Sequence, residues 1–141
     1  MNWKPFIREQ GLALSWAISL AATLGSLYFS EVKGYIPCNL CWYQRILMYP
    51  LVLLLGIAAA KRDFNITRYA LPMSLLGACF SLYHVLLENI EALKPKGASC
   101  GIVPCDVKYI NWFGFITIPT LALTAFVLIS IIHILIIRAR K

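Results

Sequence analysis

Four long apolar stretches, separated by short polar segments, dominate the pattern of hydrophobic and polar positions along this chain. Each contains about 20 residues, the length a helix needs to cross about 30 Å of hydrocarbon at about 1.5 Å per residue. In lipid, a single continuous run satisfies its own backbone hydrogen bonds only as a helix. The pattern therefore predicts membrane-spanning helices at approximately residues 11–30, 42–60, 69–90 and 112–137.

Composition supports this interpretation and excludes a soluble globular protein. Of the 141 residues, 60% are hydrophobic and only 13% are charged. Soluble domains usually carry about a quarter charged residues. The predicted fold class is an all-α membrane protein: a four-helix transmembrane bundle that forms one integral membrane domain over residues 1–141.

The distribution of charge predicts how the bundle is oriented. Basic residues outnumber acidic ones around both chain ends and the 61–68 connection: Lys4, Arg8, Lys61, Arg62, Arg68, Arg138, Arg140 and Lys141. Because cytoplasmic segments are enriched in lysine and arginine, both termini are predicted to be cytoplasmic. The segments 31–41 and 91–111 then form outer loops. The net charge of +7 follows from this bias, and no basic patch suited to nucleic acid is present.

The cysteines fall into two pairs on the predicted outer side. The chain has five: Cys38, Cys41, Cys79, Cys100 and Cys105. Cys79 stands alone in the third span and is interpreted as a small apolar side chain. Outside the cytoplasm the paired thiols tend to form disulfides. The ring closed by a C-x-x-C disulfide is too small to constrain the chain much, but it suits a disulfide that opens and closes. The pair also lies at the start of a helix, which favours the thiolate form of cysteine. Two inert bridges and a four-thiolate zinc site remain alternatives.

Two polar residues lie inside the spans near the same outer end. Arg45 follows Cys41 by four positions, on the same helix face, and a charged side chain within a span is a candidate functional residue. The alternative is an arginine that reaches the outer headgroups as an anchor. His84 lies at a similar depth in the third span, either as a packing residue or as part of a binding site.

The segment "PCNLCWYQR", residues 37–45, carries a resemblance to a known family. With "YHVLLEN" at 83–89 and "WFGFITIP" at 112–119, the chain resembles the DsbB family of disulfide-bond formation proteins. It is most similar to the small BdbC-like members from Gram-positive bacteria. The resemblance covers nearly the whole chain, including the order of the spans and the cysteine pair in each outer loop.

The resemblance implies a membrane disulfide oxidase that is driven by a quinone. It would reoxidise a thioredoxin-like thiol oxidase of the DsbA or BdbD type outside a bacterial plasma membrane. Cys100 would be attacked by the partner's thiolate, Cys105 would pair transiently with Cys38, and Cys41 would donate to the quinone. Arg45 would polarise a quinone oxygen, with His84 as a second quinone-binding candidate. The resemblance implies menaquinone as the acceptor, and we expect no metal.

One departure and two competing interpretations accompany this resemblance. Cys100 and Cys105 are separated by only four residues, whereas larger family members separate this pair widely, so the exchange between Cys105 and Cys38 is the least supported step. Vitamin K epoxide reductases also combine four helices, cysteine pairs and a quinone, but their C-x-x-C lies on a late helix. A non-catalytic four-span protein with structural disulfides is the other alternative.

The orientation can be tested by labelling cysteines from either side of the membrane. In a cysteine-free background, Lys33→Cys and Lys96→Cys are expected to react with an impermeant maleimide in intact cells. Asp63→Cys should react only after permeabilisation, because it lies in the basic connection assigned to the cytoplasm. The reverse labelling pattern would contradict the predicted topology.

Overall fold

The computed structural model describes residues 3–34, 39–90 and 118–141, and this part of the chain is helical, without strands. α1 covers Trp3–Leu27 and continues into a π-helical turn, η1, at Tyr28–Val32. α2 covers Asn39–Lys61, a short 3₁₀ turn η2 covers Phe64–Ile66, α3 covers Thr67–Asn89 and α4 covers Ile118–Arg140.

The four helices are long and apolar enough to cross a membrane, which confirms the predicted all-α class of a multi-pass membrane protein. Their membrane-length stretches run over Trp3–Val32, Trp42–Lys61, Phe64–Leu87 and Pro119–Arg140. α2 passes through Pro50 without ending. One lost backbone bond is tolerated in a membrane helix because neighbouring groups can satisfy the freed carbonyl.

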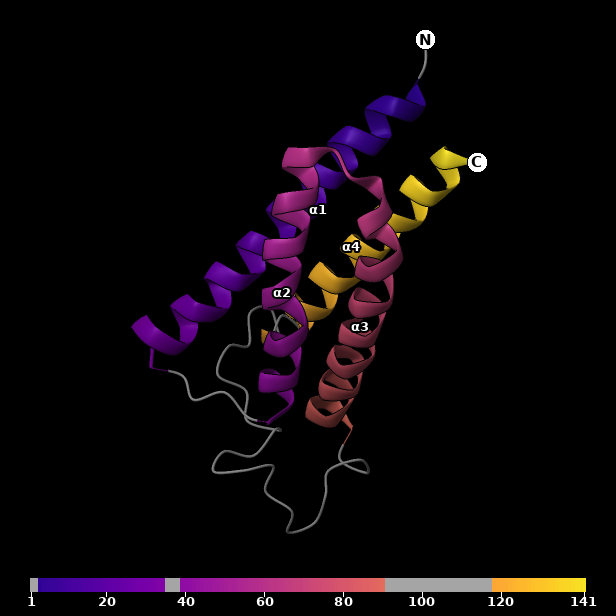
Figure 1. The fold of residues 1–141 in the computed structure, drawn as a ribbon. Coiled ribbons are helices and arrows are strands. Elements are labelled where there is room, and N and C mark those ends of the chain that lie inside the picture. The colour runs from indigo at the N-terminus through magenta and orange to yellow at the C-terminus, as the bar shows by residue number, and fades with distance from the viewer. Residues whose placement is uncertain (1–2, 35–38, 91–117) are drawn as a thin grey trace.

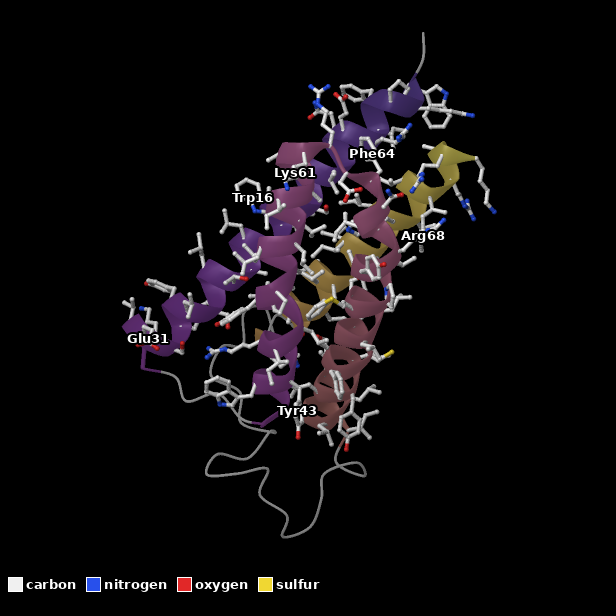
Figure 2. All side chains as sticks on the ribbon, in the orientation of Figure 1. Trp16, Glu31, Tyr43, Lys61, Phe64 and Arg68 are labelled. Atoms are coloured by element: carbon white, nitrogen blue, oxygen red, sulfur yellow. The ribbon has the colours of Figure 1, made fainter. Side chains whose placement is uncertain are left out.

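The helices form a ring in which each contacts its two neighbours in chain order, and α4 closes the ring against α1. Both chain ends and the α2–α3 connection lie at the same end of the bundle (Figure 1). Lys61, Phe64 and Arg68 mark this end, whereas Glu31 and Tyr43 lie toward the opposite end (Figure 2). The side of the membrane that each end faces remains a prediction from the charge distribution.

The bundle places apolar side chains outside and many of its polar ones inside. Large side chains such as Leu53, Ile46 and Tyr69 are more than half exposed, as is expected for a surface that meets lipid. Cys79, expected to be a small apolar residue, is also exposed on α3. The buried polar side chains are Ser15, Ser19, Gln44, Thr67, Ser74, Ser81, His84, Ser130 and His133.

Glycines set the closest approaches between helices. A Cβ at Gly56 of α2 would lie 2.8 Å from the Trp16 indole nitrogen of α1, and a Cβ at Gly77 of α3 would overlap the Phe126 ring of α4. Small residues of this kind let membrane helices pack tightly, where no hydrophobic effect drives them together. Phe126 is fully buried and belongs to a central apolar cluster with Leu12, Met48, Leu51, Leu55, Ala58, Ala70, Ala125 and Ile129.

From the contact between Trp16 and Gly56, α1 and α2 diverge toward the end that holds η1 (Figure 1). Two polar pairs join α3 and α4 in the half of the bundle near the α2–α3 connection: Ser130 donates to Ser74 over 2.9 Å, and His133 Nδ1 lies 3.4 Å from Thr67 Oγ1. Near the start of α2, the side chains of Trp42, Tyr43 and Ile46 are exposed, which matters for the residues predicted to be functional.

Candidate functional site

The first two turns of α2 contain two of the residues on which the functional prediction rests. Cys41 and Arg45 both belong to α2, and His84 belongs to α3 near its end at Asn89. Cys38, Cys100 and Cys105 lie outside the described residues, as does the side chain of Cys41. The geometry of this site is therefore defined by the polar side chains that surround the start of α2.

Arg45 is half-buried and bonds to Ser26 of α1 through two of its nitrogens. Its Nε donates to the Ser26 hydroxyl over 2.9 Å, and its Nη2 donates to the Ser26 backbone carbonyl over 3.1 Å. Both donors lie on the same edge of the planar guanidinium, so the two bonds fix the plane of the group. Arg45 thus spans the gap between the diverging ends of α1 and α2.

Trp42 lies one turn before Arg45 and carries an aromatic surface beside the positive charge. The Arg45 Cζ is 5.4 Å from the centre of the Trp42 ring, within the range of a cation–π contact. The Trp42 side chain is 52% exposed. An exposed indole next to a guanidinium forms a flat apolar surface with hydrogen-bond donors at its margin, which suits a planar ligand with carbonyl oxygens.

Gln44 and His84 form a second polar contact, between α2 and α3. The Gln44 Nε2 lies 3.2 Å from His84 Nδ1, and the two side chains are only 5% and 2% exposed. With the amide nitrogen donating, Nδ1 accepts the bond and the neutral ring carries its proton on Nε2. His84 is therefore a buried, hydrogen-bonded residue held by the helix that carries Arg45.

The two contacts lie on different sides of α2. Consecutive residues of a helix are rotated by about 100° from each other, because a turn takes 3.6 residues. Gln44 consequently points to His84 on α3, while Arg45 points to Ser26 on α1. Ser26 of α1, the partner of Arg45, and His84 of α3 thus flank the start of α2 from two neighbouring helices.

An aromatic contact closes the α2–α3 side of this region. The rings of Tyr43 and Phe80 lie 5.6 Å apart, with planes inclined by 31°. Both residues are partly exposed, at 49% and 37%. Together with the Gln44–His84 pair, this contact holds the first turns of α2 against α3 while the α1 side stays more open.

The sequence analysis missed Gln44 and Ser26. Gln44 carried a usable signal, because an amide within an apolar span needs a hydrogen-bond partner inside the bundle. Ser26 carried no such signal. A serine near the end of a span usually bonds to its own helix, and only the packing of α1 beside α2 brings it to Arg45.

Within the part of the chain that the structure describes, no three histidine, cysteine or acidic side chains gather where they could hold a metal ion. The four-thiolate alternative needs the sulfur atoms of all four paired cysteines, which lie outside that part. The described polar groups at the start of α2 include the Arg45 guanidinium, whose N–H groups are donors of the kind that bind a carbonyl oxygen.

Comparison with known proteins gives a consistent family assignment. The family model described as "Disulfide bond formation protein DsbB" matches residues 8–136. The chain is 53% identical over 131 residues to the "Probable disulfide formation protein C" of Bacillus cereus, covering 93% of this chain and 94% of the relative. It is 55% identical over 120 residues to the "Disulfide bond formation protein C" of Bacillus subtilis, covering 85% and 87%. No solved structure matches the chain.

The contact between Gln44 and His84 can be tested with a double-mutant cycle. We expect Gln44→Met and His84→Phe to show a coupling of about 0.5–2 kcal/mol in the free energy of unfolding, measured by denaturant titration in detergent micelles. As a control, Gln44→Met combined with Ser130→Ala should be additive, because Ser130 bonds to Ser74 and Phe126. Additive effects for Gln44 and His84 would show that their contact contributes nothing to stability.

Proposed function

Since this chain belongs to the DsbB family of disulfide bond formation proteins, we propose that it is a quinone-dependent disulfide oxidase. Family membership implies a protein-disulfide oxidoreductase that works in a membrane. The proposed substrate is an extracytoplasmic thioredoxin-like thiol oxidase of the DsbA or BdbD type, and the proposed location is a bacterial plasma membrane. The observation that carries the quinone assignment is the Arg45 guanidinium, oriented by Ser26 one turn from Cys41.

The proposed electron path begins at the outer cysteine pair. A thiolate of the reduced partner attacks Cys100 of the Cys100–Cys105 disulfide, and the mixed disulfide resolves to give an oxidised partner and two thiols on this chain. Those thiols then reduce the Cys38–Cys41 disulfide, with Cys105 pairing transiently with Cys38. Two electrons and two protons move in each exchange, so the partner ends as a disulfide and Cys38 and Cys41 end as thiols.

The quinone, proposed to be menaquinone, is the second substrate and accepts two electrons and two protons. The described residues fit such a ligand. Arg45 supplies charged N–H donors for a carbonyl oxygen that gains negative charge, and fixed donors of this type stabilise a developing oxyanion. Its positive charge also favours the thiolate of Cys41 over the thiol. Trp42 offers an exposed ring face beside these donors.

His84 is proposed as the second polar group of the quinone site. Its burial and its bond to Gln44 fix the orientation of the imidazole, so its proposed contribution is to hold the start of α2 in the position that the quinone site needs. The Gln44–His84 pair also holds α2 against α3. The position of α2 is therefore fixed independently of the bond between Arg45 and Ser26. This arrangement places a charged donor and a neutral imidazole on two sides of the helix that carries Cys41.

The role of the outer pair can be tested with Cys100→Ala. This variant is expected to lose transfer from the reduced thioredoxin-like partner, because the exchange needs a disulfide that the partner's active site can reach. Added quinone should still oxidise the reduced Cys38–Cys41 pair. This oxidation is measured by trapping the thiols that remain free. Cys79→Ala is the matched control and should keep both reactions. Normal oxidation of the partner by Cys100→Ala would show that the partner reacts elsewhere.

The role of Arg45 can be tested by measuring quinone reduction apart from partner exchange. Arg45→Met is expected to slow quinone reduction by about 10²–10³, the usual effect of removing one oxyanion donor. Arg45→Lys should recover only part of the rate, because a point charge lacks the planar fork of donors. A single exchange with the partner, run without quinone, should be almost unaffected in either variant.

The control for Arg45 is Arg62→Met, which removes an exposed arginine that pairs with Glu9 near the opposite end of the bundle. This variant should reduce quinone at the wild-type rate. Equal rates for Arg45→Met and the wild-type protein at limiting quinone would show that Arg45 is only an anchor at the membrane surface.

A further inference from the structure

We infer that Ser26 is a positioning residue for quinone reduction, one that fixes the Arg45 guanidinium in the orientation needed to receive a quinone oxygen. The inference rests on the proposed function, because it assigns a role to a residue that acts through Arg45. Ser26 belongs to α1, outside the cysteine motif and outside the helix that carries it. It would make α1 a functional part of the site.

The bonding pattern of Arg45 supports this role. Ser26 accepts from Nε through its hydroxyl and from Nη2 through its carbonyl, so it occupies one edge of the guanidinium. A guanidinium has five N–H groups, and the opposite edge still carries Nη1. With one edge held by the protein, the other edge has a defined direction in which to donate to a ligand.

The Ser26 hydroxyl behaves differently from comparable serines in the same protein. The hydroxyls of Ser15, Ser19, Ser30 and Ser74 donate to the carbonyl three residues earlier in their own helix. This back-bonding is the ordinary use of serine in a helix. Ser26 instead accepts from a charged side chain of another helix. Hydrogen bonds to charged groups contribute more than neutral ones, so this contact is strong enough to select an orientation.

The local backbone explains why a fixed partner is needed here. α1 and α2 diverge toward this end of the bundle (Figure 1), and Arg45 is half-buried between them, held by its two bonds to Ser26 and its contact with Trp42. The π-helical turn η1 begins at Tyr28, two residues after Ser26. Segments of this type are often found at functional sites. Without the Ser26 hydroxyl, the guanidinium would keep the carbonyl bond and the Trp42 contact, but one hydrogen bond no longer fixes its plane.

The test uses the full-length protein in detergent, with dithiothreitol as the electron donor and a short-chain naphthoquinone as the acceptor. Ser26→Ala is expected to lower kcat/KM for the quinone about tenfold, since small losses of orientation reduce rates by factors of this order or more. Ser26→Thr, which keeps the hydroxyl, should recover most of the loss. Ser30→Ala removes a hydroxyl that bonds only to Leu27 of the same helix end, and should match the wild-type protein.

Two further measurements separate a positioning role from a structural one. In an Arg45→Met background, Ser26→Ala should have no additional effect on quinone kinetics, because the residue it positions is gone. In the otherwise wild-type protein, the Nε–H resonance of Arg45 in an ¹⁵N NMR spectrum should shift and exchange faster with water in Ser26→Ala than in Ser30→Ala. The Arg45→Lys variant identifies that resonance by its absence.

The outcomes distinguish this inference from the proposed function. An unchanged Nε–H resonance and unchanged quinone kinetics in Ser26→Ala would overturn the positioning role, even if Arg45→Met is slow. Equal losses from Ser26→Ala in the presence and absence of Arg45 would also overturn it, because the serine would then act on overall stability. A wild-type protein that reduces no quinone would instead refute the proposed function, and the inference with it.

Discussion

The interior of a membrane offers no water, so every polar side chain within the spans needs a partner inside the bundle or a route to its surface. Three contacts between neighbouring helices meet that requirement. Gln44 bonds to His84 between α2 and α3, Ser130 bonds to Ser74 between α3 and α4, and Arg45 bonds to Ser26 between α2 and α1. Each of these contacts joins two neighbouring helices, so the polar residues determine which faces meet, while glycines such as Gly77 determine how closely.

The same constraint explains why the start of α2 makes polar contacts with two other helices. Adjacent positions on this helix carry Gln44 and Arg45, and they bond in different directions because of the helical rotation between them. α2 is therefore fixed to α3 by a buried pair and linked to α1 by a half-buried one. The bond between Arg45 and Ser26 crosses a region where α1 and α2 diverge. The guanidinium and the exposed Trp42 ring lie side by side there. In the proposed function these are the groups that a membrane-dissolved quinone contacts, which connects the packing of the bundle to the proposed redox chemistry.

Much of the fold and part of the site could be predicted from the sequence. The four apolar runs indicate four membrane helices whatever their mutual packing, because run length and hydropathy alone decide whether a helix can span lipid. The C-x-x-C pair followed by Arg45 predicted redox chemistry, since such a small ring suits a disulfide that opens and closes, and a charge within a span is a candidate functional group. The contacts of Arg45 could not be predicted, because serines such as Ser26 and Ser30 look alike in the sequence and differ only in what packs beside them.

The sequence by itself thus determined the class of the protein, the number of its spans and the family to which it belongs, because these depend on composition, run length and local motifs. Only the tertiary structure decided that α1 supplies a partner for Arg45, that Gln44 holds His84, and that these contacts lie on different sides of α2. The physical reason is that a contact between helices depends on their rotation and crossing. Both are set by the joint packing of residues far apart in the chain, such as Trp16 against Gly56.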